Sequence, residues 1–204
     1  MTVTELRETS KGRFVVGFSD GSELRAGANA VSDLSLYMGR ELSEEEFSKL
    51  FSLAALSACK ERALRLIGMR PMSCKELFGK LTEKGETEEN AAACIAWLLD
   101  LHYLDDESYA AMVVRHYAAK GCGAQRVKNE LYRRGIDKSL WDEALAEMPE
   151  MDDAVYSQLC RKLKSDAPDR AELKRATDAL FRRGFSWDEI KAAVNKFWLE
   201  HPAD

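Results

Sequence analysis

The residue types that most often carry catalysis are scarce in this chain and show no catalytic spacing. Of its three histidines, His102 and His116 fall at apolar positions of amphipathic helical patterns, which indicates packing, and His201 lies near the end. The sequence contains no nucleophile elbow, P-loop, dinucleotide fingerprint or HExxH zinc pattern. We therefore expect no enzymatic activity and no catalytic residue, cofactor or bound metal.

Acidic pairs and cysteines are also better explained by structure than by chemistry. Asp105-Asp106 and Asp152-Asp153 each precede an expected helix, where carboxylates cap free N–H groups and favour the helix dipole. The five cysteines are an odd number without a CxxC pair, so we expect reduced thiols packed as small apolar residues. Such thiols favour a cytoplasmic protein. No apolar run reaches the roughly 18 residues of a membrane span, and the start lacks a signal-peptide pattern.

The more informative residues are basic and lie in the second half of the chain. Residues 1–106 carry 13 Lys/Arg against 18 Asp/Glu, whereas residues 107–204 carry 17 of each, within a net charge of −5. Basic side chains recur on the polar sides of two expected helices, around Leu131 and Leu180. For any single residue a solvated helix face is the ordinary alternative, but the recurrence favours contact with an acidic partner. The candidate contact residues are Arg115, Lys120, Arg126, Lys128, Arg133, Arg134, Arg170, Lys174, Arg175, Arg182 and Arg183.

These helices belong to an internal repeat with a period near 50 residues. Three leucine-containing segments that end in glycine superpose, namely Lys80–Gly85, Glu130–Gly135 and Ala179–Gly184. Each glycine follows a helical pattern, and glycine ends a helix in the left-handed conformation without a Cβ penalty. A polar N-cap candidate follows each time: Thr87, Asp137 and Ser186. We therefore predict three-helix repeats in which the glycine separates the second helix from the third.

The first 55 residues follow a different pattern. Phe14, Val16 and Phe18 alternate before the turn Ser19–Ser22, which predicts a β-hairpin, and Ser43 opens a capping box with Glu46. The predicted fold is mainly α: tandem three-helix repeats form an elongated, curved array behind a small N-terminal region that contains the hairpin. The expected domains are 1–55 for the hairpin and a helix, then 56–106, 107–150 and 151–204 for the three repeats.

Three tryptophans lie in or beside the third helices of the repeats. Trp97, Trp141 and Trp187 are therefore expected to pack between helices rather than to stack on bases. One of them at an exposed edge could still serve a partner.

Six short segments from residue 63 onward match a known family in order and spacing. They are Ala63–Ile67, Ser73–Leu77, His102–Ala110, Lys120–Gly121, Arg126–Leu131 and Arg133–Ile136. On these residues the chain resembles the RecX family of regulatory proteins. The stretch from Tyr103 to Ile136 is the most specific, and the third repeat is the least similar.

The resemblance implies a function that the residue patterns do not show. Family members bind the RecA recombinase, lie along the groove of the RecA–DNA filament and inhibit its ATPase, strand-exchange and co-protease activities. The partner that it implies is the RecA filament, with weak contact with single- or double-stranded DNA, and we expect the protein to be a monomer. Two features of the chain differ from a uniformly basic binding surface. The chain is acidic overall, and repeat one has Glu83-Lys84 where the other two repeats have an arginine pair. The alternatives are a helix-turn-helix-like DNA-binding regulator and a protein-interaction scaffold.

Overall fold

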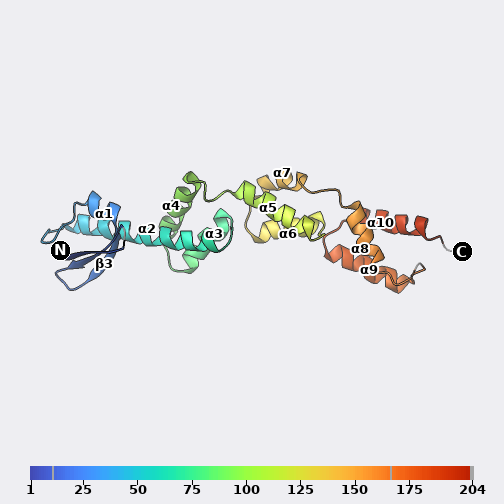
Figure 1. Ribbon diagram of the computed structural model, residues 1–204, viewed down its shortest axis with the longest axis horizontal. Coiled ribbons are helices and arrows are strands. Elements are labelled where there is room, and N and C mark those ends of the chain that lie inside the picture. The colour runs from blue at the N-terminus through green and yellow to red at the C-terminus, as the bar shows by residue number, and fades with distance from the viewer. Residues whose placement is uncertain (11, 166, 203–204) are drawn as a thin grey trace. The chain divides into compact units, whose positions relative to one another are not determined.

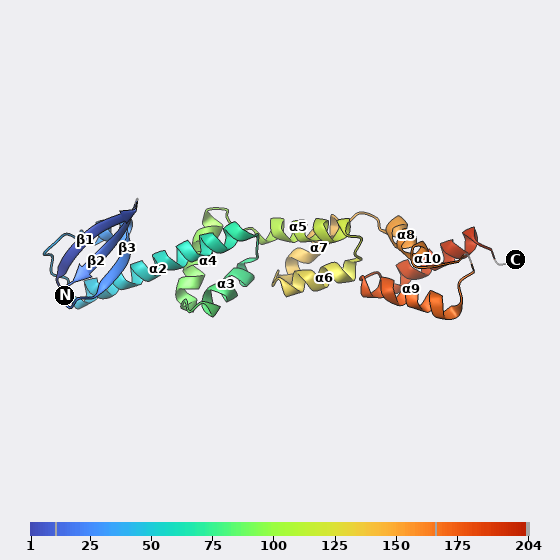
Figure 2. The ribbon, with the colours of Figure 1, turned by 60° about the horizontal axis from the view of Figure 1, so that its bottom comes forward.

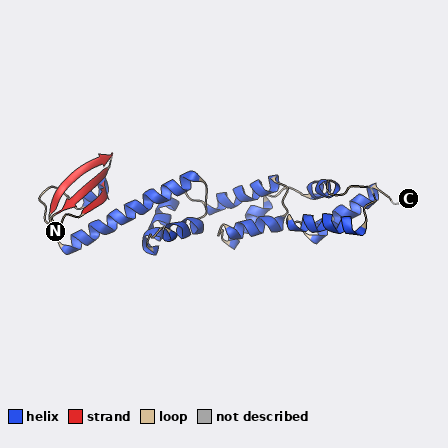
Figure 3. Cartoon of the chain, turned by 90° about the horizontal axis from the view of Figure 1, so that it is seen from below, coloured by secondary structure: helices blue, strands red, loops and turns tan. Residues whose placement is uncertain are grey.

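The chain is mostly helical, with strands confined to its N-terminal region. The computed structural model describes residues 1–10, 12–165 and 167–202 (Figure 1). It divides into two compact units, Met1–Pro71 with Leu77–Tyr103, and Met72–Glu76 with Leu104–Asp204. Figure 3 shows the described strands together at the N-terminal end and helices along the rest of the chain. The predicted fold class, helical repeats behind a small β-containing region, is confirmed.

The N-terminal region is a three-stranded antiparallel sheet. Strands β1 (Val3–Ser10), β2 (Arg13–Phe18) and β3 (Glu23–Gly27) lie in the order β1-β2-β3, so the predicted hairpin is β2–β3. Val16 and Phe18 are buried beneath the short helix α1 (Ala28–Asp33) and the start of α2 (Glu44–Met69). The Phe18 ring meets the Phe47 ring edge to face, with the ring centres 5.1 Å apart.

Helix α2 (Glu44–Met69) joins the sheet region to the first repeat. Its N-terminus is the predicted capping box: Glu46 N–H donates to the Ser43 hydroxyl at 3.1 Å, and Ser43 N–H donates to the Glu46 carboxylate at 3.0 Å. The helix ends where Pro71 disfavours a helical conformation at Arg70, which is extended. The boundary expected between residues 55 and 56 falls inside α2, so the two regions share one helix.

Repeat one is completed by α3 (Cys74–Glu83) and α4 (Glu88–Asp100). Leu77 and Leu81 are fully buried, as the repeat pattern predicts. Cys59 of α2 and Cys94 of α4 are also fully buried free thiols. They occupy core positions that suit small apolar side chains, which confirms the packing expected for these two cysteines.

The second unit contains repeats two and three (Figure 2). Repeat two consists of α5 (Asp106–Ala119), α6 (Ala124–Arg133), a 3-10 turn (Lys138–Leu140) and α7 (Trp141–Ala146). Repeat three consists of α8 (Asp152–Cys160), α9 (Arg170–Arg182) and α10 (Trp187–Glu200). Each has its own apolar core, centred on Leu131 and on Leu180.

The glycine stops behave as predicted in all three repeats. Gly85, Gly135 and Gly184 have φ of 88°, 70° and 91°, the left-handed region that glycine adopts without strain. The predicted caps follow: Thr87 accepts from Asn90 N–H at 3.2 Å, and Ser186 forms a second capping box. The same backbone stop therefore separates the second and third helices of every repeat.

The expected burial of several rings is wrong. His102 and His116 are exposed rather than packed. His102 lies after the end of α4, and His116 lies outside the buried face of α5, which includes Val113 and Val114. The spacing of Phe47, Leu50, Phe51 and Ala54 predicts an apolar stripe at the start of the long helix α2, but Phe51 is 58% exposed.

Candidate interaction surface

In repeat two, two basic residues of α6 share one buried acid. The Glu130 carboxylate, almost fully buried, pairs with the guanidinium groups of Arg126 at 3.0 Å and Arg133 at 3.3 Å. A buried carboxylate is costly unless cations and hydrogen bonds compensate it. Arg126 and Arg133 therefore stabilise the repeat as well as facing solvent, a role that their periodicity did not reveal.

Arg134 lies inside the repeat rather than on its exposed surface. Its Nη1 donates to the Tyr109 hydroxyl at 2.6 Å, and the guanidinium lies 5.8 Å from the centre of the Tyr109 ring. Burial lowers the pKa of Arg134, but hydrogen bonds with Tyr117 and Tyr109 outweigh it and raise the pKa overall. The cation is held in place by the two tyrosines, so it is the candidate least available to a partner.

Three further candidates have partners within the second unit. Arg115 pairs with Glu147 at 2.6 Å across an exposed surface. Arg183 donates from Nη2 to the backbone carbonyl of Lys120 at 2.8 Å, which joins the end of α9 to the end of α5. The ammonium group of Lys120 lies 5.6 Å from the centre of the Tyr117 ring.

The remaining candidates are the ones whose charges are unpaired. Lys128 of α6 is half-buried, whereas Arg170, Lys174, Arg175 and Arg182 of α9 are exposed. Among the described residues, none of these five side chains makes an ion pair or a hydrogen bond. The exposed side of α9 therefore carries most of the unpaired cations of the predicted set, on a helix that also contains Glu172 and Asp178.

Repeat one has a basic surface that the sequence comparison of the repeats missed. A hollow of about 520 Å³ is lined by Arg62, Arg65, Lys84 and Met69. Arg62 pairs with Glu86 at 2.6 Å and donates to the backbone carbonyl of Lys84 at 3.2 Å. Two of these cations come from α2, so aligning only the glycine-containing segments could not find them.

A close approach of backbones joins repeats two and three. Gly123 N–H donates to the Arg183 carbonyl at 3.0 Å, and Gln125 N–H donates to the Gly184 carbonyl at 3.1 Å. A Cβ on Gly184 would lie 2.2 Å from the backbone nitrogen of Arg126. The start of α6 therefore rests directly on the glycine turn after α9, and only glycine permits that approach.

The segment that opens α3 meets the equivalent turn of repeat two. The Ser73 hydroxyl, fully buried, donates to the Arg134 carbonyl and accepts from Glu76 N–H. The side chain of Lys75 lies over Gly135. Residues Met72–Glu76 thus belong to the second unit through a contact of the same kind as that between α6 and the Gly184 turn.

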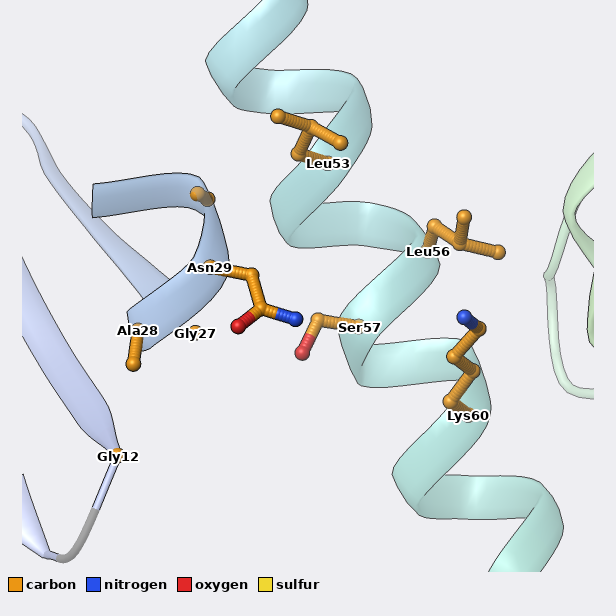
Figure 4. Close-up of a pocket in the computed structure, with 9 residues that line it drawn as sticks. Gly12, Gly27, Ala28, Asn29, Leu53, Leu56, Ser57 and Lys60 are labelled. Atoms are coloured by element: carbon orange, nitrogen blue, oxygen red, sulfur yellow. The ribbon is translucent and has the colours of Figure 1, made fainter. Parts of the chain in front are cut away.

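A second hollow of the first unit lies between α1 and α2. Figure 4 shows Asn29 and Ser57 pointing toward one another across a space of about 320 Å³, with Lys60 beside it. The Lys60 ammonium lies 4.6 Å from the centre of the Trp97 ring, so its charge is already engaged. No cluster of three metal-ligating side chains occurs in the described part of the chain. None of the described helices combines the length and apolarity that crossing a membrane requires.

Three exposed aromatic rings were not predicted as functional. Tyr132 is 70% exposed, Phe181 52% and Trp187 50%, whereas Trp187 was expected to pack between helices. Tyr132 and Phe181 each follow the buried leucine of their repeat, about 100° around the helix from it. The repeat alignment placed both rings at the same position, directly after the buried leucine.

Tandem three-helix repeats with exposed cations on α9 define the class of modular helical-repeat proteins. Comparisons with known proteins identify the family within this class. The models of the first, second and third three-helix domains of RecX match residues 59–98, 105–145 and 150–194. The chain belongs to the RecX family, and the family is one of regulatory proteins.

Individual relatives agree with this assignment. The regulatory protein RecX of Vibrio campbellii is 35% identical over 142 residues, which covers 67% of this chain and 89% of the relative. That of Caldanaerobacter subterraneus subsp. tengcongensis is 25% identical over 198 residues and covers 96% and 99%. A crystal structure of regulatory protein RecX superposes with a TM-score of 0.78 over 95% of this chain, at 19% identity. RecX from Lactobacillus salivarius gives 0.65 over 71%, at 23% identity, and both likenesses show the fold.

Proposed function

We propose that this protein is a cytoplasmic, monomeric regulator that binds RecA and the groove of the RecA–DNA filament. In this role it inhibits the ATPase, strand-exchange and co-protease activities of the filament and so modulates recombination and DNA repair. Membership of a family of regulatory proteins supports the assignment. The observation that carries the mode of contact is the unpaired, exposed set of cations on α9.

A repeat protein suits a filament partner for a physical reason. Separate repeats present separate small surfaces, and contacts linked in one chain reinforce each other through their effective concentration. Acidic patches of RecA or the phosphates of bound DNA are the chemistry that Lys174, Arg175 and Arg182 fit. Because the chain carries a net charge of −5, long-range attraction to bare DNA is weak, which favours local contact within a filament.

The test is ATP hydrolysis by RecA on single-stranded DNA, titrated with this protein. We expect inhibition by the natural chain, and weaker inhibition by Lys174→Glu with Arg175→Glu. The matched control is Arg25→Glu with Lys49→Glu, which reverses two exposed cations of the first unit with the same change in net charge. Equal inhibition by both double variants would remove the contact assigned to α9, and no inhibition by the natural chain would remove the function.

The arginine pair of repeat two is a less suitable target than the sequence suggested. Replacing Arg134 by glutamate would place a carboxylate beside Tyr109 and remove a guanidinium that packs inside the repeat. Replacing Arg133 would leave the buried Glu130 with one cation fewer. A loss of inhibition in that double variant could therefore arise from unfolding, whereas the α9 pair is exposed and unpaired.

Binding to bare duplex DNA, measured beside this titration, separates the two alternatives. A helix-turn-helix regulator would bind bare duplex tightly and in a sequence-dependent way without RecA. A scaffold for other proteins would leave both the duplex and the filament unaffected. Binding to the filament with little affinity for bare duplex supports the proposed function.

A further inference from the structure

The exposed surface of repeat three contains a stacked pair of aromatic rings. The rings of Phe181 and Trp187 lie 5.3 Å apart between centres, with only 24° between their planes. The two side chains are 52% and 50% exposed, whereas Phe185 between them in sequence is buried in the core. The pair joins the last turn of α9 to the first turn of α10 and presents a flat apolar face to solvent.

Repeat two carries an exposed ring at the corresponding position. Tyr132 follows the buried Leu131 as Phe181 follows the buried Leu180, and it is 70% exposed. A hollow of about 530 Å³ adjoins Tyr132. Its charged lining residues are the cations Lys75, Arg133, Arg134 and Lys138 and the acids Glu76 and Asp137. Both repeats of the second unit therefore place an aromatic face next to basic side chains, whereas Thr82 occupies this position in repeat one.

The charges around the stacked pair distinguish a base from a phosphate as its occupant. Asp188 and Glu189 adjoin Trp187 and serve the N-terminus of α10, where Glu189 accepts from Ser186 N–H at 2.6 Å. Carboxylates beside the rings disfavour a phosphate directly on them. The unpaired cations of α9 suit a phosphate backbone: Lys174 and Arg175 precede Phe181 along the helix and Arg182 follows it, although Asp178 also lies one turn before Phe181.

We propose that Phe181 and Trp187 form a stacking shelf for an unpaired base of single-stranded DNA, with the α9 cations contacting its phosphates and Tyr132 offering a second stacking point. Proteins that bind single strands without sequence preference combine these two elements, a positive surface and aromatic side chains. Duplex DNA hides the faces of its bases and cannot use the shelf. The inference rests on the proposed function in one respect: the single strand is supplied by the RecA filament.

The experiment measures binding of fluorescein-labelled oligonucleotides by anisotropy at low salt, without RecA. Two strands of equal length are compared: a deoxyadenosine oligomer and an abasic oligomer with the same phosphates and no bases. The variants are Trp187→Leu, which stays apolar but loses the flat face, and Phe181→Ala. The control is Phe51→Ala, the same truncation of a similarly exposed phenylalanine in the first unit, and Trp187→Phe tests rescue by a smaller ring.

We expect the natural chain to prefer the deoxyadenosine strand, and Trp187→Leu to lose about 5- to 150-fold in affinity for it. The same variant should bind the abasic strand as the natural chain does, and Trp187→Phe should recover most of the loss. Equal losses on both strands would overturn the shelf, as would an unchanged affinity in both shelf variants or no saturable binding by the natural chain. If the oligonucleotide data show the shelf but the protein does not inhibit RecA, the shelf stands and the proposed function is refuted. If the protein inhibits RecA but the oligonucleotide data show no role for the rings, the proposed function stands and the shelf is refuted.

Discussion

Replacing glycine by alanine should have a different effect at each of the three equivalent turns, because the space around the new Cβ differs. At Gly85 a Cβ would meet no atom within 4 Å, so alanine suffers only from the positive φ of 88°. At Gly135 the Cβ would lie 3.0–3.1 Å from the side chain of Lys75, which is flexible and can move. At Gly184 it would lie 2.2 Å from the backbone nitrogen of Arg126, which cannot move without separating α6 from the turn. The series therefore separates the cost of backbone strain from the cost of a broken contact.

The expected magnitudes follow from these distances. A left-handed alanine costs about 1–2 kcal/mol, which is the whole expected loss at Gly85. Gly184→Ala adds overpacking of about 1–3 kcal/mol. It also weakens the hydrogen bonds from Gly123 N–H and Gln125 N–H, about 0.5–1.5 kcal/mol each. We expect a total of about 3–8 kcal/mol at Gly184, and a value between the two extremes at Gly135.

The measurement is urea unfolding followed by circular dichroism, combined with hydrogen exchange resolved by peptide. Repeats can unfold separately, so the exchange data assign each loss to its repeat. Gly184→Ala should accelerate exchange at the start of α6 as well as in repeat three, whereas Gly85→Ala should act only within the first unit. Equal losses for the three variants would refute the claim that the Gly184 turn supports α6.

Three further predictions follow from single contacts. Ser73→Ala should destabilise the second unit by about 1–2 kcal/mol in urea unfolding, because the Arg134 carbonyl and Glu76 N–H both lose their partner; an unchanged midpoint would contradict this. Leu131→Asp should unfold repeat two, because it buries an unpaired charge, and a native circular dichroism spectrum would exclude that burial. Burial raises the pKa of the Cys59 thiol from 9.0 to about 12. The contribution of this thiol to the free energy of unfolding is therefore constant below pH 9 and declines between pH 9 and about 12, because the thiol of the unfolded chain ionises in this range before that of the folded chain. Iodoacetamide at pH 8 should therefore leave Cys59 intact in the folded protein and modify it in urea, as mass spectrometry can show.

The repeat architecture was predictable because its signals are local. Glycine stops, polar caps and buried leucines act within a few residues, so Gly85, Thr87 and Leu81 could be placed from the sequence alone. The length of α2 was missed because no local breaker separates the sheet region from repeat one before Pro71. Partners distant in sequence were also invisible, since nothing near Arg134 indicates Tyr109, 25 positions away.

The same limit divides the predicted basic residues into two groups. Periodicity identifies cations on a polar helix side but does not show whether an acid such as Glu130 or Glu147 already neutralises them. The structure leaves the α9 cations unpaired in the described chain, while most of those on α5 and α6 have partners. The net charge of the chain is therefore a poor guide to this surface, because a chain of −5 presents a helix with four exposed cations that form no ion pair in the described residues.

That division gives a quantitative expectation for salt. If Lys174, Arg175 and Arg182 each neutralise one phosphate of a single strand, the logarithm of the affinity should fall with the logarithm of salt concentration with a slope of about −2. Replacing Arg182 by alanine should reduce the slope by about 0.7, because one counterion fewer is released. Replacing Arg115, already paired with Glu147, should leave the slope unchanged. Trp187→Leu should lower the affinity at every salt concentration without changing the slope, because a stacked base releases no counterion. A slope that changes with Trp187 and not with Arg182 would mean that the rings and the cations do not hold the parts of the strand assigned to them.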